Sequence, residues 1–260
     1  MRSNASDDNM SVPDVLVRRL KGTHPLLAFS GGVDSTYLLY ACGQSGADAV
    51  PIFLRTGFQK ESQLEGAMGI GKELGYDVRV VEDDVFSYPE VVANTDDRCY
   101  LCKRRMFGKL KELADGLGCD CVIDGTNASD DPSGRPGMRA LDELGVLSPL
   151  RECGLTKDNI RGLSKEAGLP TWDMPSDSCL ATRIQAGTLI TKELLERTEK
   201  AESILSEFGF VDFRIRTKDS GAVLEVRSEQ QEILEGHKEE IGNRLSQLYD
   251  TISYGIRRSS

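Results

Sequence analysis

Two groups of residues in this sequence have the types and spacing to do chemistry. The first is a pair of glycines flanked by hydroxyls and a carboxylate, Ser30–Ser35, which reads SGGVDS. The second is a set of cysteines: Cys99 and Cys102 in a C-x-x-C pattern, and Cys179 four residues before Arg183. Backbone groups exposed by glycine suit an anion, whereas thiols suit metal ligation or sulfur chemistry.

The glycine pair follows an apolar stretch and precedes an apolar pattern typical of a helix. Gly31 and Gly32 let the backbone approach an anion closely, and the start of a helix adds a favourable partial charge. Ser30 and Ser35 can donate hydrogen bonds to the same anion, whereas Asp34 needs a cation such as Mg²⁺ beside it. The stretch lacks the lysine of a Walker-type loop.

The C-x-x-C pair stands at the expected start of a helix, next to Arg98 and further basic residues. Such a position stabilises thiolates and predicts that Cys99 and Cys102 bind metal or exchange disulfides. Cys179 lies in a non-helical, proline-flanked segment, and the nearby Arg183 predicts an ionised, exposed thiol. A purely structural role for Cys179 is the alternative.

Cys119 and Cys121 would complete a four-thiolate zinc site by number. They stand two apart at the start of an expected strand, so their side chains should share a face. Burial as small apolar residues explains them equally well. The odd total of seven cysteines favours a reducing compartment, and we expect a cytoplasmic protein.

Composition narrows the possible functions. The chain has 260 residues, 39% of them hydrophobic, and a net charge of -10. This charge argues against a protein that mainly grips nucleic acid through its phosphates. No apolar run is long enough to span a bilayer, and the polar first dozen residues do not resemble a secretory signal.

Apolar runs alternate with helical patterns over the first two-thirds of the chain, which predicts a parallel sheet with helices on both faces. The expected strands are Pro25–Ser30, Ala49–Leu54, Asp77–Glu82 and Cys121–Asp124. The expected helices are Ser35–Gln44, Glu61–Leu74, Cys102–Leu117 and Thr156–Ala167. Ser129–Gly137 is rich in proline and glycine and should be an exposed loop.

The pattern changes after about Gly187 and predicts a smaller α+β module. Its expected helices are Thr191–Phe208 and a second that begins at a capping box of Ser228 and Gln231 and ends near Leu248. Its expected strands are Phe213–Thr217, Ala222–Arg227 and Thr251–Tyr254.

The SGGVDS motif resembles the pyrophosphate-binding loop (PP-loop) of the N-type ATP pyrophosphatases, and Asp124–Asn127 resembles their second nucleotide-facing segment. The resemblance implies an α/β domain of the adenine nucleotide alpha hydrolase type over residues 1–186, followed by an α+β domain over 187–260. It also implies ATP and Mg²⁺ as cofactors. The ATP-binding residues would be Ser30, Gly31, Gly32, Asp34, Ser35, Gly125 and Thr126.

Further motifs narrow the resemblance to the LarE family of ATP-dependent sulfur transferases. They are RPGMRA at Arg135–Ala140, SPL at Ser148–Leu150, GLTKDNIRGLSKEAGLPTWD at Gly154–Asp173, and CLATR at Cys179–Arg183. The resemblance covers nearly the whole chain. It implies adenylation of a carboxylate on a pyridinium mononucleotide, followed by replacement of the activated oxygen with sulfur. Cys179, Asp34 and Arg183 would act in catalysis.

The family resemblance implies two possible sulfur sources. In one, Cys179 gives up its own sulfur and becomes dehydroalanine. In the other, Cys99, Cys102 and Cys179 hold a [4Fe-4S] cluster whose fourth iron binds an extra sulfide. We favour the cluster because the sequence carries the additional C-x-x-C pair. Sulfide or another sulfur donor would then replenish it.

The second module carries the remaining resemblance. Arg214 and Arg216 alternate on an expected strand, so both side chains point to one face and suit a substrate phosphate. Glu202 and Glu225 resemble family acidic residues near this phosphate or a metal. The turn between the strands reads Lys218–Gly221, KDSG, where the family often has histidine and glycine, so contacts that depend on the turn are in doubt.

Three other functions stay open at this point: a tRNA-thiolating enzyme, an ammonia-using synthetase, and a non-catalytic nucleotide sensor with structural zinc. The acidic charge and the lack of an added RNA-binding domain argue against nucleic acid as a partner. We expect a small carboxylated nucleotide as substrate and no membrane partner. By analogy with related enzymes, we also expect a homo-oligomer.

Overall fold

The computed structural model describes residues 12–132 and 135–257. It divides into two compact units. The first takes in the chain up to Leu54 together with Ser62–Val81 and Lys103–Met174, and the second takes in Arg55–Glu61, Glu82–Cys102 and the chain from Pro175. Two early segments thus belong with the C-terminal part. A domain boundary at residue 186 stays a prediction.

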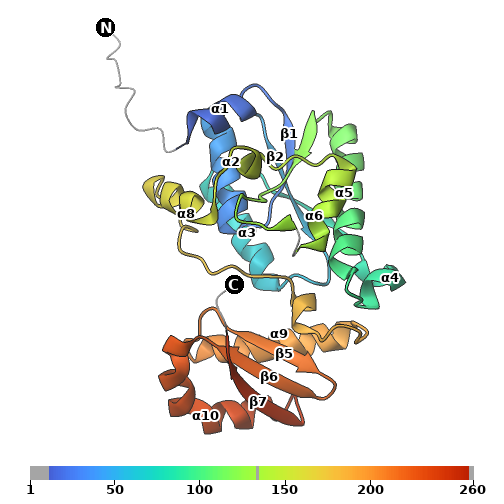
Figure 1. Ribbon diagram of the computed structural model, residues 1–260, viewed down its shortest axis with the longest axis vertical. Coiled ribbons are helices and arrows are strands. Elements are labelled where there is room, and N and C mark those ends of the chain that lie inside the picture. Colours follow the sequence, from blue (N-terminus) through green and yellow to red (C-terminus); the bar gives the residue numbers. More distant parts are fainter. Residues whose placement is uncertain (1–11, 133–134, 258–260) are drawn as a thin grey trace. The chain divides into compact units, whose positions relative to one another are not determined.

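The first unit is built on a four-stranded sheet in the order β3-β2-β1-β4 (Figure 1). The strands are β1 (Pro25–Ala28), β2 (Val50–Arg55), β3 (Arg79–Glu82) and β4 (Cys121–Ile123). β1 pairs in parallel with β2 on one side and with β4 on the other, so that Leu26 lies opposite both Val50 and Val122. The prediction of a parallel α/β sheet is confirmed.

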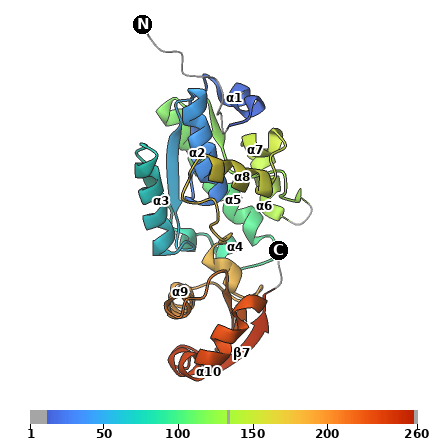
Figure 2. The same cartoon turned by 90° about the vertical axis from the view of Figure 1, so that its left-hand side faces the viewer.

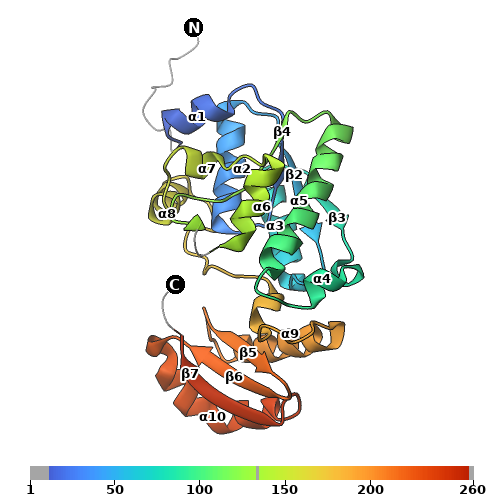
Figure 3. The same cartoon turned by 45° about the vertical axis from the view of Figure 1, so that its right-hand side comes forward.

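Alternating side chains of these strands feed two separate cores. Leu27 and Ile123 point to one face, where they join a cluster with residues of α1, α2 and α8. Leu26 and Val122 point to the other face and pack with residues of α5 and α6 (Figure 3). The helices are α1 (Asp14–Leu20), α2 (Val33–Ser45), α3 (Glu61–Glu73), α5 (Arg98–Leu117), α6 (Pro136–Leu144), α7 (Pro149–Glu152) and α8 (Lys157–Glu166).

The expected helices recur with shifted ends. α5 begins at Arg98 rather than Cys102, which places the whole C-x-x-C pair in its first turns. The exposed-loop prediction for Ser129–Gly137 is wrong at its end, because Pro136 starts α6 in the first-turn position that proline favours. Asp130 is also buried rather than exposed. Residues 133–134 lie outside the described part of the chain.

The second unit contains a three-stranded sheet in the order β5-β6-β7. β5 (Arg214–Lys218) and β6 (Gly221–Val226) form an antiparallel hairpin, and β7 (Thr251–Ile256) pairs with β6 in parallel. α9 (Lys192–Glu207) and α10 (Gln231–Leu245) lie on one face of this sheet (Figures 1 and 2). They bury a core that includes Leu205, Ile215, Leu224 and Ile241.

Short helical turns complete this unit: η1 (Val85–Ser87), α4 (Pro89–Val92), η3 (Leu180–Arg183) and η4 (Ser228–Gln230). The capping box expected from Ser228 and Gln231 is wrong, because Ser228 forms part of η4 and α10 starts without a side-chain cap. A true capping box occurs at Thr156 and Asn159, where α8 begins.

Among the described residues, no helix has both the length and the apolar character that a bilayer crossing requires. The first eleven residues lie outside the described part, so the expectation about the N-terminal segment is not addressed. The cytoplasmic location stays a prediction.

Replacing either of two glycines by alanine should change the free energy of unfolding, in opposite directions for Gly46 and Gly66. Gly46 ends α2 in the left-handed region, at φ 71°, so Gly46→Ala should cost roughly 1 kcal/mol of unfolding free energy. Gly66 lies inside α3 with open space around it, so Gly66→Ala should stabilise by roughly 0.5–1 kcal/mol. Urea unfolding measures both, and equal effects would contradict the assignment.

Candidate functional site

The glycine loop joins β1 to α2 in a conformation that only glycine tolerates well. Gly31 has φ 73°, and a Cβ built there would lie 2.8 Å from the Cα of Ala67. Gly32 is the residue that precedes the first turn of α2. The helix start therefore presents its unpaired backbone N–H groups at the loop, as expected for an anion site.

Hydroxyl groups brace this loop from within. The Ser35 hydroxyl donates to the carbonyl oxygen of Gly32 at 3.1 Å, and the Ser30 and Ser35 hydroxyl oxygens lie 3.1 Å apart. The Gly32 N–H donates to the Ser30 hydroxyl at 3.4 Å. The structure thus brings together Ser30, Gly31, Gly32 and Ser35 as one compact loop.

The second predicted segment lies directly against this loop. A Cβ at Gly125 would come within 3.0 Å of the Ser35 backbone nitrogen, so the close approach requires glycine. The preceding Asp124 is buried, and its carboxylate accepts hydrogen bonds from the hydroxyls of Thr126 at 2.5 Å and Ser148 at 2.7 Å. Gly125 and Thr126 are therefore held at the start of α2.

Asp34 is held by a lysine that the sequence pattern did not reveal. Lys157, the first residue of α8, places its Nζ 2.6 Å from an Asp34 carboxylate oxygen, and the Asn127 amide lies 3.4 Å from the other. Burial raises the pKa of Asp34, and Lys157 opposes that shift. The motif GLTKDN contains the lysine and its cap Thr156, which was the available signal.

The three predicted cluster cysteines belong to the second unit. Burial, together with the neighbouring Cys179 and Cys99 thiols, raises the pKa of Cys102 to about 12. Burial also raises the pKa of Cys179, against the opposing effect of Arg98. The expected ionisation is wrong for the Cys102 and Cys179 thiols, and the expected exposure of Cys179 is wrong as well, because both are half-buried and desolvation outweighs the neighbouring positive charges.

Cys102 and Cys179 pack against the same apolar cluster, and Cys99 stands three residues before Cys102, so the set fits a three-thiolate ligand group in kind and number. Their side chains are not arranged as ligands, however. Within residues 12–132 and 135–257, no three Cys, His, Asp or Glu side chains are grouped so that they could hold a metal ion.

Arg98 ties the two cysteine-bearing segments together. Its guanidinium donates to the Cys99 sulfur at 3.4 Å, to the Asn94 side-chain oxygen at 2.6 Å and to the Ala181 carbonyl oxygen at 2.7 Å. Asn94 is buried in the left-handed region, and its amide donates to the Gln185 carbonyl oxygen at 2.8 Å. Sequence reasoning missed Asn94, which stands in no recognisable motif.

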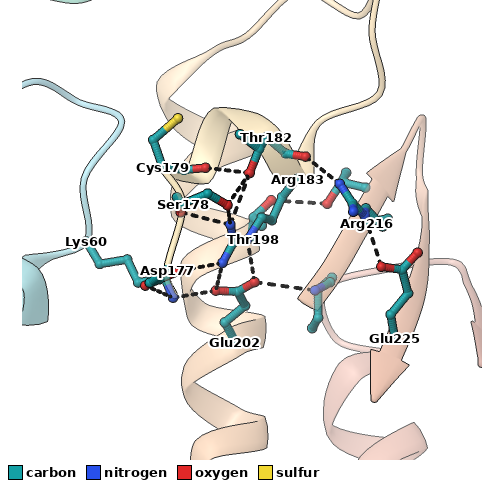
Figure 4. A network of polar contacts seen from close by, with 12 residues as sticks. Lys60, Asp177, Ser178, Cys179, Thr182, Arg183, Thr198, Glu202, Arg216 and Glu225 are labelled. Atoms are coloured by element: carbon teal, nitrogen blue, oxygen red, sulfur yellow. Dashed lines mark hydrogen bonds and ion pairs between the residues drawn. The ribbon is translucent and has the colours of Figure 1, made fainter. Parts of the chain in front are cut away.

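A second arginine, which unlike Arg98 is fully buried, organises the segment that carries Cys179 (Figure 4). Arg183 is 2% exposed, and its Nε donates to Glu202 at 2.8 Å. The same guanidinium donates to Asp177 at 2.7 Å and to both the carbonyl and hydroxyl oxygens of Ser178. The Cys179 sulfur points away from this network. Arg183 therefore acts on Cys179 through the backbone that it holds.

Glu202 is engaged inside the same network rather than open to a ligand. It is 3% exposed, and it accepts from Arg183, from Lys60 at 2.7 Å and from the Ile215 backbone N–H at 3.3 Å. Lys60 also contacts Asp177 at 3.1 Å. The placement favours a positioning role for Glu202.

Arg214, Arg216 and Glu225 lie on the face of the second sheet opposite α9 and α10, since Ile215 and Leu224 between them point into the core. Arg216 donates to Glu225 at 3.1 Å and to the Thr182 carbonyl oxygen at 2.8 Å. The Nε of Arg214 is buried and has no hydrogen-bond partner among the described residues.

A pocket of about 540 Å³ lies within the second unit. Its walls include Arg98 and Cys99 from the start of α5, Thr182 from η3, and Arg216 and Glu225 from the sheet. The pocket thus brings one of the predicted sulfur ligands together with two of the predicted substrate-binding residues.

Cys119 and Cys121 do not point to the same face of the sheet. Cys119 packs against the core that contains α5, whereas Cys121 packs against the core that contains α2. Cys119 lies before β4 starts, where strand alternation does not yet apply. The prediction that both side chains share a face is therefore wrong. Among the described residues, neither thiol belongs to a group of side chains that could hold zinc.

Comparisons with known proteins agree with this geometry. A scan against protein-family models found no match. An uncharacterized protein of Synechocystis is 37% identical over 206 residues, covering 79% of this chain and 77% of that protein. One subunit of a glutamine-hydrolyzing GMP synthase from Methanococcus vannielii is 27% identical over 217 residues, covering 76% of this chain and 67% of that subunit.

The parallel sheet, the glycine loop at the start of α2 and this last similarity define a PP-loop α/β protein. A pyridinium-3,5-bisthiocarboxylic acid mononucleotide synthase from Lactiplantibacillus plantarum is 31% identical over 202 residues, covering 77% of this chain and 73% of that enzyme. The chain belongs to this family of synthases, the LarE family.

The Asp177 carboxylate should make stability depend on pH. Burial alone would raise its pKa, but Lys60 and Arg183 hold the pKa below its ordinary value of 3.8. The stabilisation is therefore complete above that value and is lost as the pH falls through the lowered folded-state pKa. Asp177→Asn should lower the unfolding free energy at neutral pH, with a gap that narrows in acid.

Urea unfolding across this pH range measures the gap, with the exposed Asp173→Asn as the matched control. A deficit in Asp177→Asn that stays constant into acid would contradict the ion-pair explanation.

Proposed function

We propose that this protein is an ATP-dependent sulfur transferase that activates a carboxylate of a pyridinium mononucleotide as an adenylate and replaces the activated oxygen with sulfur. The observation that carries the proposal is the pocket that joins Cys99 to Arg216 and Glu225, together with the packing of Cys102 and Cys179 against one apolar cluster. Membership of the LarE family supports the same reaction.

The first half of the reaction is assigned to the glycine loop. A carboxylate oxygen is a poor leaving group, whereas AMP is a good one, so ATP must be cleaved between the α and β phosphates. Backbone N–H groups at Gly31 and Gly32 and the hydroxyls of Ser30 and Ser35 would bind the departing pyrophosphate. Asp34 would bind Mg²⁺, a hard cation that prefers carboxylate oxygens.

Lys157 supplies the positive charge that the loop motif itself lacks. Its 2.6 Å contact with Asp34 places the ammonium group at the start of α2. With Mg²⁺ held at Asp34, Lys157 would be able to donate to a phosphate oxygen. The lysine would thereby offset the negative charge that develops on pyrophosphate as the bond to the α phosphate breaks.

The second half of the reaction is assigned to the three cysteines. Cys99, Cys102 and Cys179 would hold a [4Fe-4S] cluster, which when bound supplies an iron that can carry an extra sulfide. Arg98 and the Arg183 network hold the two segments that carry these thiols. The alternative is that Cys179 donates its own sulfur.

The substrate's phosphate is assigned to Arg214 and Arg216. Both lie on one sheet face, and guanidinium groups bind phosphate through paired hydrogen bonds. Glu225 orients Arg216 through their 3.1 Å contact. The sulfur donor and the homo-oligomeric state stay predictions.

Removing the Lys157 charge tests the proposed ATP-cleaving half of the reaction. Lys157→Met should weaken Mg·ATP binding by roughly 10-fold, because one charge-assisted hydrogen bond to phosphate is lost. Isothermal titration and ATP–pyrophosphate exchange with a carboxylated mononucleotide measure the change. Lys165→Met, on the same helix but packed over Trp172, is the matched control. Equal behaviour of the two variants would rule out the assigned role.

Purification without oxygen tests the proposed sulfur-transfer half of the reaction. The protein should be brown, with about four irons per chain. Cys102→Ser should lose the iron, and Cys119→Ser should keep it. A colourless, iron-free protein whose Cys179 loses the mass of H₂S after turnover would instead support sacrifice. Full product formation by Cys179→Ala would refute both routes and favour an ammonia-using synthetase.

A further inference from the structure

Arg161 is a basic residue of α8 to which the proposed reaction assigns no role. It stands one helical turn after Lys157, so the two side chains project from the same face of the helix. Lys157 contacts Asp34 at 2.6 Å. Burial raises the pKa of Asp34, and the charges of Lys157 and Arg161 oppose that shift. Arg161 therefore faces the glycine loop closely enough to act on a charge that is bound there.

The Arg161 guanidinium also holds an exposed segment of the chain by its backbone. One terminal nitrogen donates to the Trp172 carbonyl oxygen at 2.7 Å, and the other donates to the Met174 carbonyl oxygen at 2.6 Å. Residues 172–176 are exposed and belong to no helix or strand. Exposed carbonyl oxygens can equally accept from water, so the segment can give up these two bonds at little cost in free energy.

The segment leads along the chain to the thiol of Cys179. Met174 is followed after two residues by Asp177, whose carboxylate pairs with Arg183 at 2.7 Å. One arginine, Arg161, thus holds the start of this exposed stretch, and another, Arg183, holds its end. Cys179 follows two residues after Asp177. The hold of Arg161 therefore bears on the stretch of chain that directly precedes the cysteine segment.

A bound nucleotide would compete with the two carbonyl oxygens for Arg161. A guanidinium binds a phosphate oxygen more strongly than a neutral carbonyl oxygen, because both partners of the hydrogen bond are then charged. ATP at the glycine loop brings several negative charges to the face of α8 that carries Lys157 and Arg161. The two states of Arg161 thus differ in how strongly they bind the nucleotide, which is what a ligand needs in order to shift the balance between them.

We propose that Arg161 is a positioning residue that couples nucleotide binding to the segment at residues 172–176. In the free protein it holds the segment through the carbonyl oxygens of Trp172 and Met174, and with ATP bound it turns to a phosphate oxygen and releases them. This inference rests on the proposed function, because it needs ATP at the glycine loop. The stretch before Cys179 is then loosened only when the activating nucleotide is present, which keeps sulfur transfer in step with adenylation.

Trp172 is the only tryptophan of the chain, so its fluorescence reports on this segment alone. The probe is the magnesium complex of α,β-methylene ATP, an analogue that cannot be cleaved between the α and β phosphates. Calorimetry measures its binding to the full chain, and acrylamide quenching of Trp172 is measured in the same solutions. Binding of the analogue should raise the quenching constant of the wild-type protein, because the released segment exposes the indole ring further.

Arg161→Met should show the raised quenching constant without nucleotide, and saturating analogue should add no further increase. Its affinity for the analogue should fall by roughly 10-fold, since one charge-assisted hydrogen bond is lost. Arg161→Lys keeps the charge but cannot span both carbonyl oxygens, so it should bind the analogue more tightly than Arg161→Met and still start from raised quenching. Lys165→Met is the matched control, because Lys165 lies one turn further along α8 with its Nζ 4.5 Å from the centre of the Trp172 ring. It should keep the nucleotide-dependent increase.

A wild-type protein that binds the analogue with unchanged quenching of Trp172 overturns the inference and leaves the proposed function standing, because Arg161 would then have a merely structural role. A nucleotide-dependent increase of full size in saturated Arg161→Met overturns it as well, and Arg161→Lys answers the same question if the methionine variant does not fold. A wild-type protein with no affinity for the analogue refutes the proposed use of ATP together with the inference.

Discussion

The buried ion pair between Arg183 and Glu202 is the interaction on which the cysteine segment depends. Both side chains are almost completely buried, and between them they contact Lys60, Asp177 and Ser178. Removing one partner of such a pair leaves an uncompensated charge and costs about 3–5 kcal/mol. The guanidinium also donates to the Ser178 carbonyl oxygen and to the Thr182 hydroxyl, which stand on either side of Cys179, so the same arginine anchors the segment that carries this thiol.

The glycine loop likewise depends on a small number of residues. Gly31 and Gly125 are each required by close backbone approach, and together they bring two strand ends to the start of one helix. Polar side chains around them, including Asp34 and Asp124, are paired internally. The loop is thereby preorganised, which would reduce the conformational entropy lost on binding the proposed nucleotide.

Local patterns predicted much of the fold. Apolar runs such as Ala49–Leu54 predicted strand positions within a residue or two, here β2 at Val50–Arg55, and the SGGVDS motif placed the loop correctly between β1 and α2. Long-range pairs could not be predicted in this way. Lys157 is 123 residues from Asp34, and Lys60 is 117 residues from Asp177, and no periodicity links them. Protonation was also misjudged at Cys179, because a sequence shows neighbouring charges but not burial.

The second unit is assembled from three separate segments of the chain, which limits how the protein can be divided into fragments. Lys60 and Arg98, which hold its cysteine segment, come from Arg55–Glu61 and Glu82–Cys102, far upstream of Pro175. No single cleavage point separates the second unit from the first. A C-terminal fragment that begins near residue 187 would leave Glu202 without both of its cationic partners, so the module must be made and studied within the intact polypeptide.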